Sequence, residues 1–577
     1  MRFSRIRRYF LVFFFVLGAA SSFPPAPVFG QASVNVPVTD PVYRDIDKLV
    51  AHGLVDKIIM GQRPFSRREI ARIVKEAMVH LPRLQGPLED PQVPESRKEK
   101  LRARLDYLKP IFERLKRDYH EELVQNGALE GETKWYSVHL LEKVEADLGV
   151  ASSPAEPLPV SNGLGSIDAV INPLLDYRQG RHLVDGANLG LETTTWLRAS
   201  DYFAMLVRPR FQLGLGRNAT PDQNRADVLN LYGKFWVKNL EIQIGRDNLM
   251  WGQGIEAGQL LSTNPRGLDM AKISNDSPFF LPWVFKYLGA NKISFFYADL
   301  GPEQNFPNAY LVGYKWSLQP LNFFEIGAAL LTQSGGDGSP PASFFDRVRD
   351  VFPVDQAGGV NQVEIGNHIG GVDFRFRIPP ARGLELYVEA NFDDNHNPFS
   401  KPKKAFVDDA AYVAGFYLPR VDEAGAIDLR MEYRRTGLRF YEHAQFVSGW
   451  TLNQFLMGDN LGPNAWGLYG TVNWDVDPSN LLSFHGAFES RSSDLWTVVD
   501  PAGEFIFTKV ADGPEERRLR GRVEWLHRVQ GFPLQVRAQL AYERAQNFNF
   551  VAGNDRNNFL GEVGLRFEFD RWTRFPR

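Results

Sequence analysis

The feature that most limits how this chain can fold is a two-residue alternation of apolar and polar side chains through its last three-quarters. A β-strand projects successive side chains to opposite faces, so the alternation gives one apolar face and one charged face. Many such segments, each of roughly ~9–11 residues, are typical of a transmembrane β-barrel. The segment 559–569 illustrates the pattern, with Phe559, Val563, Leu565, Phe567 and Phe569 on one face and Glu562, Arg566 and Glu568 on the other.

The start of the chain has the layout of a secretory signal peptide. Four arginines precede an apolar run at 9–20, and the small residues Gly30 and Ala32 offer a cleavage point. The run is too short to cross a membrane as a helix. We therefore predict a signal peptide over 1–32, with a buried N-terminal helix as the alternative.

Composition excludes several classes of protein. The chain has 577 residues and no cysteine, which excludes a disulfide framework, a thiolate metal site and a lipid-anchored cysteine. The formal net charge of −3 becomes −7 without the four signal-peptide arginines, so a nucleic-acid partner is disfavoured. No later stretch is apolar and long enough for a membrane helix, although aromatic residues make up 13% of the chain. No cofactor and no metal are predicted.

A helical region of different character is predicted over 33–130. Asp40 can cap a first helix that stops at Gly53, and Ser66 with Glu69 forms a capping box for a second helix. These helices form either a periplasmic bundle that packs on itself or a module that plugs the barrel or docks a partner. The spacing of apolar residues along the helices cannot distinguish these two arrangements, because any amphipathic helix must bury its apolar face somewhere.

A third, longer helix is expected around 101–123, where leucines and aromatic residues recur at intervals of three and four. Pro110 lies inside this segment and should kink it.

The barrel is predicted over 134–577, as an all-β, antiparallel transmembrane barrel of about 18 strands. Both ends then lie in the periplasm, which requires an even number of strands. Its interior should carry charged residues on neighbouring strands, which either pair across the wall or select a permeating solute. The expected members of this lumen charge ladder are Arg375, Arg377, Glu385, Glu389, Arg430, Glu432 and Arg434.

Long irregular stretches between strands are expected outside the cell, because periplasmic turns in such barrels are short. Binding residues are most often found on loops of this kind. The longest stretches are 248–291, 333–367, 393–411, 449–465 and 491–516.

Two strings carry a family resemblance. Residues 245–285 read GRDNLMWGQGIEAGQLLSTNPRGLDMAKISNDSPFFLPWVF, and residues 61–71 read GQRPFSRREIA. With the signal peptide, the helical lead and the many strands, they resemble the Wzi-like capsule assembly family of outer-membrane proteins. The resemblance covers nearly the whole mature chain.

This resemblance implies a non-enzymatic protein of the Gram-negative outer membrane with an N-terminal helical bundle. Its partners would be outer-membrane lipid and a capsular or other exported polysaccharide, held non-covalently. Contact with the polysaccharide export machinery is a further expectation.

Five residues of the first string supply the chemistry that carbohydrate needs. Sugar rings stack on aromatic side chains, and sugar hydroxyls require amide, carboxylate and guanidinium partners. The predicted polysaccharide-binding residues are therefore Trp251, Asn264, Arg266, Asp269 and Trp283. An aromatic girdle at the membrane surface, or a loop folded into the lumen, is the alternative interpretation.

Rival functions depend on weaker signals. A porin or saccharide channel is favoured if the lumen is open. A hydrolase barrel has little support, because the histidines on strand-like segments lack a serine and an acid in a recognised motif. The alternating run at 391–397 hints at calcium, but His396 and Pro402 occupy the positions where an EF-hand needs Gly and Glu. A non-standard surface calcium site remains open.

Overall fold

The structure is a computed structural model that describes residues 32–160, 163–216, 224–254, 258–351, 365–393, 404–499 and 506–569. The predicted signal peptide therefore lies almost entirely outside the described residues. Within these ranges no helix is long and apolar enough to cross a membrane.

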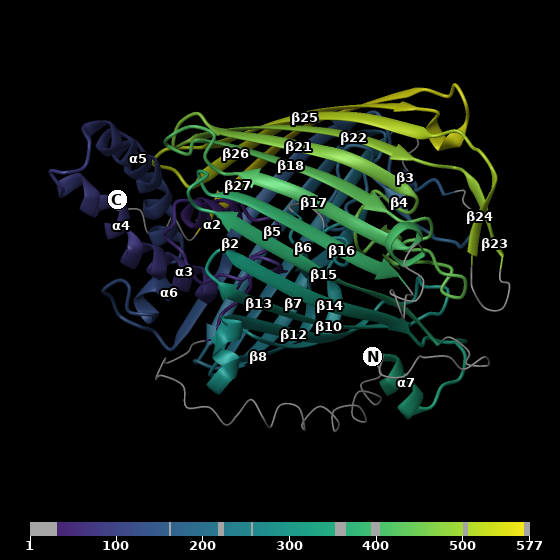
Figure 1. Ribbon diagram of the computed structural model, residues 1–577, viewed down its shortest axis with the longest axis horizontal. Helices are drawn as coiled ribbons and strands as arrows, with labels where there is room; N and C mark the ends of the chain where they lie inside the picture. The colour runs from purple at the N-terminus through teal and green to yellow at the C-terminus, as the bar shows by residue number, and fades with distance from the viewer. Residues whose placement is uncertain are drawn as a thin grey trace.

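Eighteen strands of 8 to 16 residues form a closed antiparallel barrel, shown in Figure 1. Neighbours in the wall follow one another along the chain, and β2 closes the wall by pairing with both β27 and β5. The predicted fold class is confirmed. The strands are β2 Tyr136–Ala151, β5 Gly186–Ala199, β6 Phe203–Gly216, β7 Arg225–Val237, β8 Leu240–Asp247, β10 Leu268–Asn275, β12 Ala290–Asp299, β13 Tyr310–Leu321, β14 Phe324–Ser334, β15 Gly366–Ile378, β16 Leu384–Asp393, β17 Ala410–Leu418, β18 Ile427–Thr436, β21 Ala465–Asp475, β22 Asn480–Arg491, β25 Glu516–Arg528, β26 Leu534–Gln546 and β27 Arg556–Glu568.

The side-chain alternation separates a lipid-type outer face from a polar inner face. On β27, Phe559, Val563 and Leu565 are exposed on the outside of the wall. Glu562 points inward, where its carboxylate is buried and pairs with Arg181 at 2.9 Å. The period of two in the sequence therefore fixes which atoms face lipid and which face the lumen.

The two ends of the barrel differ in the length of their connections. At the end that carries the helices, turns such as 238–239 and 322–323 are two residues long. At the opposite end, connections such as 437–464 are far longer. Short turns belong to the periplasmic side of such barrels, so the helices mark the periplasmic end, on the left of Figure 1.

The helical region packs around its own apolar core. Ile46, Leu49, Ile70, Val74 and Leu115 are among the buried members of this core. Ser66 Oγ accepts the backbone N–H of Glu69 at 2.9 Å, so the predicted N-terminal cap of the second helix is present. The helices are α2 Val42–Ala51, α3 Arg67–His80, α4 Pro82–Glu89, α5 Glu95–Asp118 and α6 His120–Gln125.

The long third helix differs from its sequence prediction at both ends. α5 begins at Glu95, contains Pro110 and ends at Asp118, and the chain then begins a separate helix, α6, at His120. Residues 82–89 form a further short helix, α4, which Pro82 can begin because the first helical position needs no hydrogen-bonded N–H.

The helical region also closes over the periplasmic mouth of the barrel. Its side chains and backbone contact inward-facing groups on at least six strands of the wall, so this region fills the mouth as well as packing on itself. These contacts include Asp40 with Lys143 on β2 and Arg566 on β27, Asn35 with Asp247 on β8, Gln62 with Ser317 on β13, Gly61 with Glu325 on β14, and Lys48 with Asp428 on β18.

His52, directly after α2, gives this packing a dependence on pH. Burial lowers the pKa of His52 well below its usual range, and Arg104 and Arg420 lower the same pKa further. Arg104 Nε donates to His52 Nδ1 at 3.2 Å, so the ring is neutral. The unfolded imidazole binds a proton below about pH 6.5 and the folded one does not, so stability is lost as the pH falls below that value.

We expect the helical region of the native protein to lose stability as the pH falls from 6.5 to 5 through His52, with a slope that rises toward at most about 1.4 kcal/mol per pH unit. The His52→Gln variant should lack this component. Hydrogen exchange of α2 amides at several pH values measures the difference between the two proteins. Parallel pH profiles for the two would contradict the role of His52.

Loops from the long-loop end fold inward and build a second apolar core inside the barrel. Trp251, Leu260, Tyr441, Trp450 and Leu456 come from two loops, and all five are buried. Inward-facing strand residues complete this core, which we call the loop core: Met270, Phe296, Leu311, Leu331, Ile369 and Ala411.

The two loops of the loop core are also tied by hydrogen bonds. Trp450 Nε1 donates to the carbonyl oxygen of Leu260 at 3.1 Å, and Tyr441 Oη donates to that of Gln259 at 2.6 Å. A short strand pair, β1 Gln62–Arg63 with β9 Met250–Trp251, joins the helical region to the loop core. The smaller elements are β3 Glu156–Pro157, β4 Val170–Ile171, β11 Phe279–Phe280, η4 Trp283–Leu288, α7 Phe344–Val351, η5 Lys404–Asp408, β19 Thr451–Leu452, β20 Phe455–Leu456, β23 Leu495–Val499, β24 Ile506–Ala511 and η6 Phe548–Phe550.

Candidate functional site

The extracellular end carries an open cleft of about 600 Å³ beside the loop core. Three connections meet there: the segment after β3, the base of the β23–β24 hairpin and the turn between β26 and β27. The cleft is lined by Pro157, Leu158, Pro159, Val160, Ser493, Gly513, Pro514, Asn549 and Phe550.

The turn between β26 and β27 presents its cleft residues on a constrained backbone. Asn547, Asn549 and Phe550 all have positive φ, at 51°, 54° and 57°. L-residues adopt this conformation at a free-energy cost of order ~1–2 kcal/mol, so surrounding contacts must hold it in place. The conformation of this turn is therefore set by its surroundings and not by the local sequence alone.

The contacts that hold the turn come from charged side chains, of which Arg518 and Glu516 are buried. Phe548 is buried beneath two guanidinium groups, with Arg556 at 4.5 Å and Arg518 at 5.8 Å from its ring centroid. The N–H of Asn549 donates to Glu516 Oε2 at 2.8 Å. With Phe548 anchored below, the Asn549 amide and the Phe550 ring line the cleft above.

The chemistry of this cleft suits a saccharide. Phe550 and the proline rings offer flat apolar faces, and Asn549 offers a donor and an acceptor for hydroxyl groups. At its edge Glu156 pairs with Arg556 at 2.7 Å, and the arginine side chain keeps about a third of its surface exposed. A neutral or acidic sugar unit would find both stacking and polar partners here.

Two of the five predicted binding residues lie inside the barrel. Trp251 is 1% exposed and packs against Phe296, with ring centroids 5.2 Å apart. Asn264 is also buried, and its amide donates to the carbonyl oxygen of Leu456 at 3.0 Å. Both residues stabilise the loop core, which matches the alternative of a loop folded into the lumen.

Arg266 and Asp269 lie together near the extracellular end of β10. Asp269 accepts from Arg266 at 3.0 Å and from Arg246 on β8 at 2.7 Å. The Asp269 side chain is 41% exposed, so this cluster reaches the surface of the wall.

Trp283 lies at the opposite end of the molecule, and the expectation of one extracellular loop over 248–291 is wrong. Residues 268–275 form β10, which pairs with β8 and β12 and carries the chain across the wall. Residues 276–289 therefore lie at the periplasmic end, where Lys57 of the helical region sits 5.1 Å from the Phe280 ring centroid. The eight-residue strand was missed because charged and small residues interrupt its apolar pattern.

The seven residues of the lumen charge ladder are buried within the barrel. Glu385 pairs with both Arg375 and Arg377, and Arg434 pairs with Glu432. The other two contact the inserted segments. Arg430 pairs with Asp47 of α2 at 3.4 Å, and Glu389 accepts the backbone N–H groups of Gln253 and Gly254 at 2.6 and 2.7 Å. Residues of the ladder therefore bind both segments that fill the lumen, the helical region through Arg430 and the loop core through Glu389.

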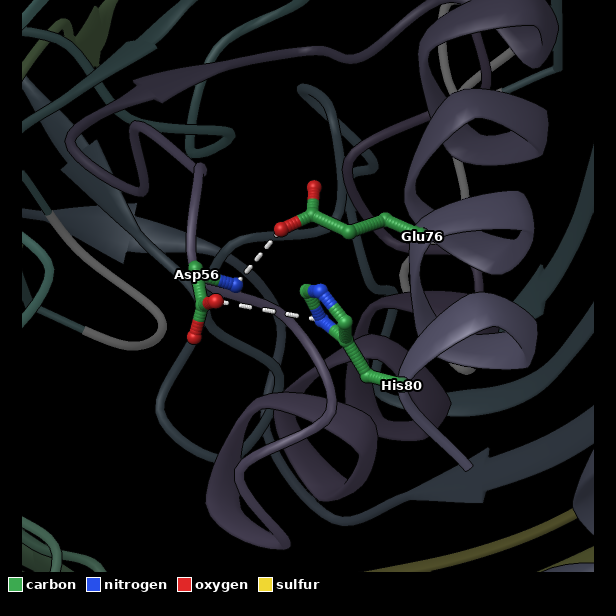
Figure 2. A group of neighbouring side chains, drawn as sticks. All are labelled: Asp56, Glu76 and His80. Carbon is green, nitrogen blue, oxygen red and sulfur yellow. Dashed lines mark hydrogen bonds and ion pairs between the residues drawn. The ribbon is translucent and has the colours of Figure 1, made fainter. Parts of the chain in front are cut away.

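One group of side chains in the helical region has metal-ligand types, Asp56, Glu76 and His80, shown in Figure 2. Each of these groups already has a protein partner. Asp56 accepts two bonds from Arg83, Glu76 accepts the N–H groups of Asp56 and Lys57, and His80 Nδ1 lies 3.1 Å from the carbonyl oxygen of Leu54. The group therefore acts as a clamp between α3 and the segment after α2.

Ser493, Gly513 and Pro514 lie in the predicted extracellular stretch 491–516, but sequence reasoning did not single out any cleft residue. Asn549 and Phe550 lie in a short connection that looked like an ordinary hairpin turn. The one signal was the string NFNF at 547–550, in which asparagines, tolerant of positive φ, alternate with aromatic residues.

Residues 170–560 match the family described as Capsule assembly protein Wzi. The chain belongs to this family. The family predicted from the sequence is therefore confirmed, and the matched region contains most of the cleft, whereas the helical lead precedes it.

Individual relatives are distant. An uncharacterized 55.8 kDa protein in the cps region of Klebsiella pneumoniae is 26% identical over 165 residues, 28% of this chain and 31% of that relative. The chain thus matches about a third of that relative's length.

Among solved structures, Wzi of Escherichia coli is similar, with a TM-score of 0.60, 15% identity, and coverage of 93% of this chain and 100% of that one. It is an outer-membrane protein involved in group 1 capsule assembly and a carbohydrate-binding β-barrel. OccD3 of Pseudomonas aeruginosa aligns with a TM-score of 0.41 and 10% identity over 76% of this chain and 92% of that one.

Proposed function

We propose that this barrel lies in the outer membrane of a Gram-negative bacterium and holds a capsular or other exported polysaccharide at the cell surface by non-covalent binding. Membership of the Wzi capsule assembly family supports this role. The observation that carries the proposal is an asymmetry. Protein fills both ends of the lumen, whereas the extracellular face keeps an open cleft lined by three prolines and the aromatic residue Phe550.

The mechanism would be multivalent. One cleft grips one repeat unit weakly, but many copies of the protein contact one long polymer, so the combined attachment is strong. No covalent step is needed for retention.

The porin alternative fits the structure less well. A barrel of ~18 strands leaves an aqueous channel only when its lumen is empty. Here the loop core and the helical region occupy the lumen from opposite ends. The predicted contact with export machinery remains a proposal.

The cleft can be tested in cells of the native host. The Phe550→Ala and Asn549→Ala variants should each shift polysaccharide from the cell-associated to the shed fraction. Loss of one stacking contact, at about 1 kcal/mol, weakens each grip roughly fivefold, and multivalency enlarges the effect. Total carbohydrate in washed cells and in the supernatant gives the measurement.

A matched control lies in the same turn. Val551 is 56% exposed but does not line the cleft, so Val551→Ala should leave the distribution unchanged. Normal heat-modifiable migration of every variant shows that the barrel has folded. Unchanged retention in both folded cleft variants would count against this surface.

A further inference from the structure

The 3₁₀-helix η4 presents an unusually apolar surface at the periplasmic end. None of its six residues is buried. A cluster of this kind is unfavourable in water, because the transfer of each apolar side chain out of water is favourable. The exposed fractions are 85% for Trp283, 69% for Val284, 55% for Phe285 and 75% for Tyr287.

The lipid-facing band of the barrel continues directly into η4. Ile293 on β12 and Trp316 on β13 are cross-strand partners, and both are exposed on the outer face. The chain leaves η4 and enters β12 only a few residues from this pair. In Figure 1 η4 is the teal coil at the helix-bearing end, beside β8 and β12.

Gly289 fixes this position of η4 against the wall. Its φ is +74°, and a Cβ at this residue would lie 1.8 Å from the carbonyl oxygen of Gln319 on β13. Only glycine allows the chain to turn so closely to the end of β13. The exposed helix is therefore held at the rim of the barrel.

We propose that η4 inserts into the headgroup region of the periplasmic leaflet of the outer membrane and binds phospholipid there. Trp and Tyr favour this depth, because their rings combine an apolar body with a polar atom. Lys286 is exposed beside them and can contact lipid phosphate. This inference goes beyond polysaccharide retention and does not depend on it.

The chain itself supplies a clean way to test the site, because it contains no cysteine. Val284→Cys can carry a single nitroxide label in the full-length protein, reconstituted in vesicles of phosphatidylethanolamine and phosphatidylglycerol. The label should collide often with oxygen, which concentrates in lipid, and rarely with a water-soluble nickel complex. Two matched positions calibrate the scale: Ile293→Cys on the lipid-facing wall and Glu99→Cys on the exposed face of α5.

We expect accessibility to nickel at position 284 to be several-fold lower than at position 99, and to lie between the values at positions 99 and 293. Equal nickel accessibility at 284 and 99 would overturn the proposal. So would a label that is protected in whole cells but exposed in these vesicles, because the occupant would then be a protein. If Val284→Cys fails to insert, Tyr287→Cys makes the same comparison.

Discussion

Combined removal of the helical region and of the two loops of the loop core should convert this protein into an open channel. The variant lacks residues 33–130, and short Gly-Ser linkers replace residues 249–266 and 438–462. An empty barrel of ~18 strands has a lumen wide enough for water and ions, so large and stable conductance steps are expected in planar bilayers. The intact protein should show none.

Each single deletion should conduct far less than the double deletion, because the two fillings lie in series. Removing residues 33–130 leaves the loop core, in which Trp450 and Trp251 are buried. Removing the two loops leaves the helical region bound to strands of the wall through contacts such as Gly61 with Glu325.

The deletion of 438–462 is geometrically mild. The N–H of Asn464 donates to the carbonyl oxygen of Gly437 at 2.8 Å, so the two ends of this loop already touch. Shortening the β23–β24 hairpin, which lies outside the loop core, is the matched control and should not open the barrel. A double variant that inserts, migrates as a heat-modifiable band and still fails to conduct would contradict a lumen closed by these two parts.

The barrel was predictable because its signal is local and repeated. Each strand needs only an apolar face for lipid, and Phe559, Val563 and Leu565 show that the period of two is enough to define this face. The N-terminal cap that Ser66 forms on the second helix was equally predictable, since it depends only on Ser66 and on Glu69 three positions later.

The filling of the lumen was not predictable in the same way. Trp251 and Trp450 are 199 positions apart in sequence, yet both belong to the loop core. Aromatic and Gly-rich loops look alike whether they reach into solvent or fold inward, so Trp251 was interpreted as a sugar contact. The cleft was missed for a related reason: three distant connections contribute to it, and no single string carries its chemistry.

The sidedness of Trp283 depended on one short strand. Counting β10 as loop kept residues 276–289 on the outer side of the membrane, whereas crossing the wall once more moves them to the inner side. Omitting one strand therefore inverts the predicted side of the membrane for the residues that follow it, even when the fold class is right.

Two carboxylates of the barrel, one buried and one exposed, form ion pairs with the helical region. Asp428 on β18 is buried and accepts from Lys48 at 2.8 Å and from Arg44 at 2.9 Å. Glu423, in the preceding turn, accepts from Lys100 of α5 at 3.0 Å, but both of these side chains are about half exposed. Both carboxylates connect the helical region to the barrel, but Asp428 is buried and Glu423 is exposed.

Asp428→Asn should release the helical region, and Glu423→Gln should not. Without the Asp428 charge, Lys48 keeps only neutral carbonyl partners in a buried site, which costs about 3 kcal/mol, or roughly a 100-fold rise in the undocked fraction. Loss of the exposed pair is screened by water and too small to detect. Hydrogen exchange of α2 amides in the reconstituted protein compares the two variants. Equal exchange in both would mean that the apolar core of the helices, and not the buried charge, holds them at the mouth of the barrel.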